Sequence, residues 1–240
     1  MQRRLWGTAL IACVLGLAAS RAIATPLAWY TFNNGPQIFV TNWTTDPEGD
    51  WMANFHGQTS DYEITCNIEM TEDPQIVYGL SVTNHSNQPN PATFTFDFTD
   101  TWAVPLVSPT ITYGAFGGHV NDATGDGIGI SRVNSYMQMA DLNGQDSNTD
   151  AYNHDFSRGT GFPGVVYDIC TDTQGPRTGP NGSFTQLHVR TAFNLTDNDD
   201  VAVLTGSAIL FQQPVPEPAS ALLLLPGLLG LVAWRSRKRA

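Results

Sequence analysis

Lysine is absent from residues 25–214, and this stretch contains only four arginines. The same residues include 21 aspartates and glutamates, which gives the stretch a net charge of −17. Nucleic-acid binding needs lysine and arginine side chains that neutralise phosphates, so nucleic acid is excluded as a partner. Only 14% of the whole chain is charged and 41% is hydrophobic. A highly charged disordered tail and a multi-span membrane protein are therefore excluded as well.

Familiar catalytic patterns are also missing. The five histidines show neither the H-E-x-x-H pattern nor a paired spacing, and no G-x-S-x-G nucleophile turn occurs. The sequence therefore predicts a protein that is not an enzyme. Carboxylates such as Asp97, Asp100 and Glu63 would suit a glycosidase if two of them lay about 5 to 9 Å apart. A secreted glycan hydrolase accordingly stays open as an alternative.

The basic residues that the middle lacks are gathered at the two ends. Near the N-terminus, two arginines precede an apolar run over residues 5–19, and Ala22 and Ala24 are the small residues that signal peptidase requires. We expect residues 1–24 to be a secretory signal peptide that is cut after Ala24. A buried core helix and a lipidated Cys13 are the alternatives, although the apolar run continues beyond Cys13.

The C-terminus carries a second apolar segment. Residues 219–234 are uncharged and rich in leucine, and a basic tail follows at residues 235–240. A helix of this length spans about 24 Å, and its flanking residues can compensate for a bilayer core of about 30 Å. We therefore expect one transmembrane helix over 219–234. Because positive charge stays in the cytoplasm, the acidic middle then lies outside the inner membrane.

A proline motif stands just before this segment. It consists of Val215, Pro216, Glu217 and Pro218, and its prolines keep the backbone extended and open to a protease. Together with the leucine-rich span and the basic end, the motif resembles the PEP-CTERM sorting signal of Gram-negative bacteria. The matching basic residues are Arg235, Arg237, Lys238 and Arg239, and Ser236 is the one departure.

The resemblance covers residues 215–240 and implies a processing route. In that family, a membrane-embedded exosortase recognises the signal, removes the tail and passes the protein toward the outer surface, often alongside exopolysaccharide production. Signal peptidase, exosortase and the inner membrane before processing are therefore the expected partners. The protein would end at the cell surface or outside the cell. An ordinary anchor behind a proline-rich linker is the alternative.

Between the ends, apolar residues recur with the period of two that half-buried strands show. The clearest runs are Ile76–Val82 and Phe94–Phe98, which we expect to form a hairpin. A single pattern with helical spacing covers Val133–Ala140. The sequence predicts an all-β, two-sheet antiparallel, jelly-roll-like sandwich over residues 25–214. The other predicted strands are Leu27–Phe32, Gln37–Trp43, Tyr62–Glu69, Ile111–Phe116, Val165–Thr171, Phe184–Phe193 and Val201–Phe211.

The longest polar stretch, residues 121–161, is expected to be an insertion or loop region. At its start, Asp122 and Asp126 share one loop with two glycines, and a second acidic cluster follows at residues 197–200. Carboxylate oxygens in such loops suit calcium. No cofactor is expected, because charged loop residues are more often simply solvated, and calcium binding at these aspartates is the alternative.

Two cysteines remain after signal cleavage, Cys66 and Cys170. An even number in an oxidising compartment predicts one disulfide, with buried free thiols as the alternative.

The expected function is that of an exported, non-enzymatic surface or matrix protein. A carbohydrate-binding module for exopolysaccharide is the alternative, because tryptophan rings offer stacking faces for sugars. In a small sandwich, however, aromatic residues more often pack in the core. The tryptophans concerned are Trp29, Trp43, Trp51 and Trp102.

Overall fold

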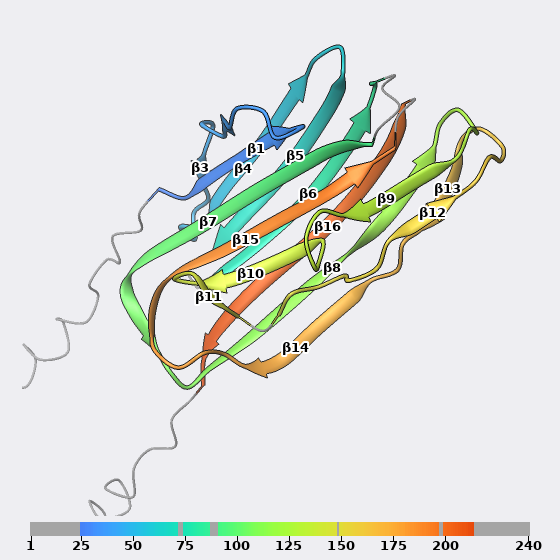
Figure 1. The fold of residues 1–240 in the computed structure, drawn as a ribbon. Helices are drawn as coiled ribbons and strands as arrows, with labels where there is room; N and C mark the ends of the chain where they lie inside the picture. The colour runs from blue at the N-terminus through green and yellow to red at the C-terminus, as the bar shows by residue number, and fades with distance from the viewer. Residues whose placement is uncertain (1–24, 72–73, 87–90, 148, 197–198, 214–240) are drawn as a thin grey trace, which may run out of the picture.

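The computed structural model describes residues 25–213 except 72–73, 87–90, 148 and 197–198. The described residues form two antiparallel sheets, and none of them belongs to a helix that could cross a membrane (Figure 1). The predicted all-β class with two antiparallel sheets is confirmed. The expected signal peptide, sorting motif, transmembrane helix and basic tail lie outside the described residues.

Sheet A has eight strands in the order β11-β10-β15-β7-β1-β2, with β9 beside β15 and β12 beside β9. The central strand β15 pairs with β7 along almost its whole length. The strands are β1 (Leu27–Phe32), β2 (Ile38–Phe39), β7 (Ala92–Val107), β9 (Ile128–Arg132), β10 (Gln138–Leu142), β11 (Gln145–Asp146), β12 (Phe156–Arg158) and β15 (Ser183–Leu195).

Sheet B has eight strands in the order β13-β8-β16-β6-β5-β4-β3, with β14 also beside β8. Its central strand β16 pairs with β8 on one side and β6 on the other. The strands are β3 (Thr44–Thr45), β4 (Trp51–Gln58), β5 (Tyr62–Thr71), β6 (Gln75–Asn84), β8 (Thr110–Asp122), β13 (Val165–Asp168), β14 (Asp172–Thr178) and β16 (Asp200–Gln212).

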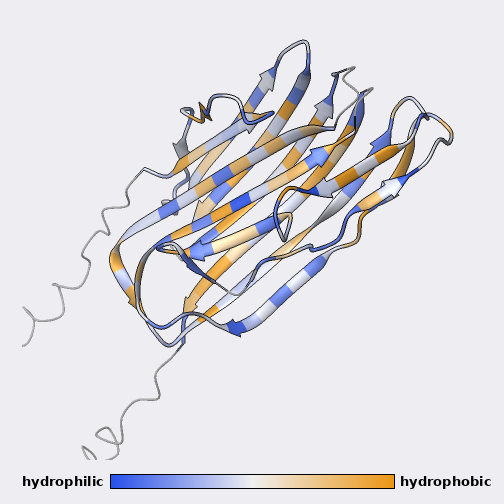
Figure 2. Cartoon of the chain, viewed as in Figure 1, coloured by the Kyte–Doolittle hydropathy of each residue, from blue (hydrophilic) through white to orange (hydrophobic). Residues whose placement is uncertain are grey.

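The core lies between the two sheets. Along β6 every second side chain is buried, and β7 buries a row of phenylalanines in the same way. Tyr78 of sheet B packs on Phe98 of sheet A, with ring centroids 4.8 Å apart. Figure 2 shows the alternation of hydrophobic and hydrophilic residues along the strands that produces this burial. The period of two in the sequence therefore predicts the core-facing side of both sheets correctly.

Three local predictions are wrong. β6 and β7 do not form a hairpin, because the chain crosses from sheet B to sheet A between them. The helical spacing at Val133–Ala140 belongs to a bend that leads into β10, which begins at Gln138. The stretch 121–161 is not a plain loop, since it contains β9 to β12. The sequence also does not predict β3, β4 and β14, and β4 has no clean alternation of buried and exposed residues.

The expected disulfide between Cys66 and Cys170 is also wrong, because both cysteines are free. Cys66 is fully buried on β5, whereas Cys170 is exposed after β13, which pairs with β8. In sheet B, β5 and β8 are three strand spacings apart, which amounts to about 14 Å. A disulfide requires Cα atoms about 4.4 to 6.8 Å apart, so the two thiols cannot meet.

Candidate functional site

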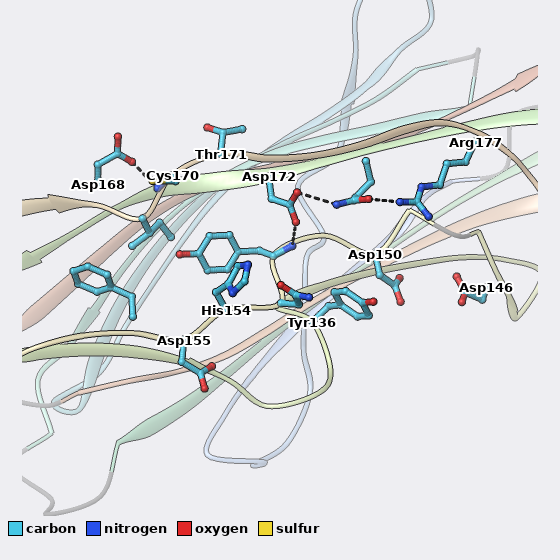
Figure 3. Close-up of a pocket in the computed structure, with 15 residues that line it drawn as sticks. Tyr136, Asp146, Asp150, His154, Asp155, Asp168, Cys170, Thr171, Asp172 and Arg177 are labelled. Carbon is cyan, nitrogen blue, oxygen red and sulfur yellow. Dashed lines mark hydrogen bonds between the residues drawn. The ribbon is translucent and has the colours of Figure 1, made fainter.

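A polar cleft of about 850 Å³ runs along one edge of the molecule. At this edge, β10 and β11 end sheet A, and β13 and β14 end sheet B. Figure 3 shows Asp168 and Asp172 along one wall and Asp150 and Asp155 along the other. The rings of three aromatic residues, Tyr136, Tyr152 and Phe156, also line the cleft. Residues from both sheet edges thus contribute to one site.

Hydrogen bonds from backbone N–H groups to the cleft's own aspartates fix its walls. Tyr152 and Cys170 both have positive φ angles, 61° and 63°, which non-glycine residues seldom adopt. The carboxylate of Asp172 accepts a 2.7 Å hydrogen bond from the backbone N–H of Tyr152. Asp168 accepts a 2.8 Å bond from the N–H of Cys170 two residues later, in an Asx-turn arrangement. The carboxylates therefore hold the two turns that shape the cleft (Figure 3).

The wall that carries Asp146 and Asp150 lies directly on sheet B. Thr112 on β8 donates a 2.8 Å hydrogen bond to the carbonyl oxygen of Ser147. At Gly114 on the same strand, a Cβ atom would clash with the backbone of Thr149. Glycine is therefore required here for the close approach of the wall to the sheet.

The cleft is strongly acidic. Five aspartates and one arginine, Arg177, line it. Burial, and then the negative charges of Asp146 and Asp141, raise the pKa of Asp150. Burial and then neighbouring negative groups, including Asp168, also raise the pKa of Tyr152. The five aspartates against one arginine give the cleft a negative potential that would favour a neutral or cationic ligand over an anionic one.

A second group of charged residues lies on the outer face of sheet A. His188 on β15 bonds through Nε2 to Asp97 on β7 at 2.9 Å and through Nδ1 to Asp141 on β10 at 2.6 Å. Burial opposes the imidazolium charge, but the hydrogen bonds to the two carboxylates outweigh it and raise the pKa of His188 to about 9. Arg190 bonds to Asp97 at 2.9 Å and lies over the ring of Trp29. The network joins four neighbouring strands.

Asp100 faces the opposite side of the same sheet. It pairs across β7 and β15 with Leu187, a core residue, and is 4% exposed. Burial raises the pKa of Asp100 to about 7, although a hydrogen bond from the backbone of Thr101 lowers it. The position explains why the carboxylates considered for the glycan-hydrolase alternative do not come together. Asp97 lies on the outer face of sheet A, and Glu63 is on β5 of sheet B.

The two candidate calcium ligands, Asp122 and Asp126, lie together, and Asp200 of the second acidic cluster lies beside them. The carboxylate oxygens of Asp122, Asp126 and Asp200 lie within 4.8 Å of one another. Asp122 and Asp200 are fully buried, and Asp126 is exposed. Asp122 accepts hydrogen bonds from the backbone N–H groups of Gly125 and Gly127. Carboxylate oxygens at this spacing could hold a calcium ion.

The calcium expectation can be tested by thermal unfolding. If the three aspartates bind calcium, a concentration of about 100 times Kd stabilises the chain by about 2.7 kcal/mol. This corresponds to a rise in Tm of about 5 to 10 °C against a chelator control. Asp126→Asn should remove most of the rise, whereas Asp46→Asn, in the turn before β4, should not. An equal Tm with calcium and with chelator contradicts the expectation.

No protein-family model and no curated protein matches the chain. The patterns in the sequence predict neither the cleft nor the His188 network. The only available signal was the period-two spacing of His188 and Arg190, which places both on one face of a strand.

Proposed function

We propose that the chain is an exported bacterial surface or extracellular-matrix protein of structural or interaction type, with a jelly-roll-like ectodomain. Signal peptidase would remove residues 1–24, and an exosortase would process the PEP signal at residues 215–240. Before processing, residues 219–234 would anchor the ectodomain on the periplasmic side of the inner membrane. The observation that supports this proposal is the charge partition, since lysine is confined to the C-terminal tail and residues 25–214 carry −17.

Deleting residues 215–240 tests the sorting proposal. The truncated protein is expected to be absent from the cell surface, whereas the full chain arrives there without its C-terminal tail. Glu217→Ala, inside the motif, should leave the tail attached, and Gln213→Ala, just before the motif, should be processed normally. Mass spectrometry of surface and membrane fractions distinguishes these products. Normal surface delivery of the truncated chain would falsify the proposal.

Carbohydrate binding is the second candidate function, and the cleft is the observation that favours it. Its volume is in the range of ligand sites, about 300 to 1,000 Å³. Tyrosine rings offer faces for sugar C–H groups, and carboxylates accept hydrogen bonds from sugar hydroxyls. Because aspartates dominate the cleft, we expect neutral or amino sugars to bind more tightly than uronic acids. Exopolysaccharide of that composition is the proposed ligand.

Binding assays with the full chain test this second function. A polymer of amino sugars and a neutral glucan should bind, and a polyuronate should bind least. Tyr136→Ala in the cleft is expected to weaken binding about tenfold, or about 1.4 kcal/mol. Tyr113→Ala, a partly exposed tyrosine on β8 outside the cleft, should leave the affinity unchanged. Equal losses in the two variants, or no binding of any polymer, would contradict carbohydrate binding at this site.

A further inference from the structure

One end of the molecule combines three segments that carry no formal charge. They are residues 101–112, 178–187 and 201–213, and none contains Asp, Glu, Lys or Arg. The three segments meet through Ser183 pairing with Val107 and Gln212 pairing with Thr110. We refer to residues 103–110, 178–183 and 210–213 as the uncharged end.

The uncharged end projects beyond the rest of sheet B. The first residue of β6, Gln75, pairs with Ile209, and β16 continues for three residues past this point. Three strand residues extend about 10 Å. In Figure 1 this end lies at the lower left, where β7 turns into β8 and the described chain ends.

Large apolar side chains are exposed at this end. Val104 and Val107 are each 50% exposed, and Phe211 is 45% exposed. Exposed apolar side chains that gather without charges between them are typical of interaction surfaces.

The chain leaves the domain at this same end. The last described residue is Gln213, and the predicted transmembrane segment begins at Ala219. Six residue steps of fully extended chain reach at most about 20 Å. While the anchor is in the bilayer, Gln213 must therefore lie within this distance of the membrane surface, which keeps the uncharged end near the bilayer.

Charge also favours this orientation. Residues 25–214 carry −17 in total, and anionic lipid headgroups repel acidic surfaces. The uncharged end can approach them with less repulsion, and valine and phenylalanine gain free energy by entering the interfacial region. We propose that the anchored ectodomain rests on the membrane surface through Val104, Val107 and Phe211. This inference depends on the C-terminal anchor of the proposed function.

The test uses the chain after signal cleavage, residues 25–240, in vesicles of phosphatidylethanolamine and phosphatidylglycerol that contain a headgroup-quencher lipid. In a Cys170→Ser background, an environment-sensitive fluorophore is attached at Val104→Cys. The matched control is Val166→Cys on β13, which is similarly exposed, at 57%, but pairs with Asn121 at the far end of β8. The fluorophore at position 104 is expected to be quenched at least about twofold more than the one at position 166.

A second substitution separates docking from mere proximity. Phe211→Asp places a charge in the uncharged end and should reduce the quenching at position 104. Phe162→Asp is the control, because Phe162 is 81% exposed in the loop before β13, and it should leave the quenching unchanged.

Each other outcome overturns the inference. If the chain floats with the vesicles but both positions are quenched equally, or Phe211→Asp has no effect, docking is refuted and the anchor stands. If the chain does not float with the vesicles, the anchor fails and docking fails with it. If the fluorophore at position 104 responds to protein concentration in detergent and not to lipid, a second copy of the chain covers this end.

Discussion

Replacing Asp100 with asparagine is expected to stabilise the protein by about 4 kcal/mol at pH 8 and to change its stability little at pH 4. The reason is the inward position of this carboxyl, whose pKa rises by burial from 3.8 in the unfolded chain to about 7. Between these two values the folded state binds a proton that the unfolded state does not. The stability of the wild-type chain therefore falls as pH rises through this window, and it stays low above it.

Denaturant unfolding at a series of pH values measures this effect. The Asp100→Asn variant should lack the fall between pH 4 and 7. Asp97→Asn is the matched control, because Asp97 lies three residues earlier on β7 and faces outward to His188 and Arg190. It should destabilise the protein at neutral pH. Parallel pH profiles of the wild-type chain and Asp100→Asn would show that Asp100 ionises normally.

Replacing His188 with glutamine is expected to cost about 3 kcal/mol at pH 6, and the loss should shrink as pH rises through 9. Bonds to Asp97 and Asp141 raise the pKa of His188 from 6.5 to about 9. The folded state thus holds the imidazolium more tightly than the unfolded chain does. This stabilisation is complete below pH 6.5 and is lost above 9.

The control for this prediction is His56→Gln, because the His56 side chain is 51% exposed. A surface substitution of this kind should change stability by no more than about 0.5 kcal/mol at any pH. A loss for His188→Gln that is the same at pH 6 and pH 10 would refute the ionic role of the network. The pH range over which Asp100 lowers stability adjoins the range over which the His188 contribution is lost. The wild-type chain should therefore lose stability continuously from about pH 4 to pH 9.

Much of the fold could be predicted because strand burial follows a local pattern. The run Leu27–Phe32 matches β1 at both ends, and the predicted strands at 184–193 and 201–211 lie within β15 and β16. The same pattern does not predict which strands pair. Ile76–Val82 and Phe94–Phe98 are neighbours in sequence, yet they join different sheets, where β6 pairs with β5 and β16 and β7 pairs with β1 and β15. Alternation specifies which side of a strand is buried but not which sheet it joins.

The site was less predictable for the same reason. Asp122 and Asp126 share a loop, so their proximity followed from the sequence, whereas Asp200 joins them only through the pairing of β8 with β16. The walls of the cleft come from residues on either side of position 160, and turns with positive φ at Tyr152 and Cys170 bring them together. Neither residue is a glycine, so no pattern in the sequence predicts these turns.

The central positions of β15 and β16 affect when the protein can fold. These two strands lie in the middle of sheets A and B, and they are the last described strands in the chain. A polypeptide that ends before Ser183 lacks the middle of both layers at once. Such non-local topologies fold slowly, so an emerging chain would stay unfolded until its last residues are released. A secretory channel that accepts only extended polypeptide would therefore receive the chain while it is still unfolded.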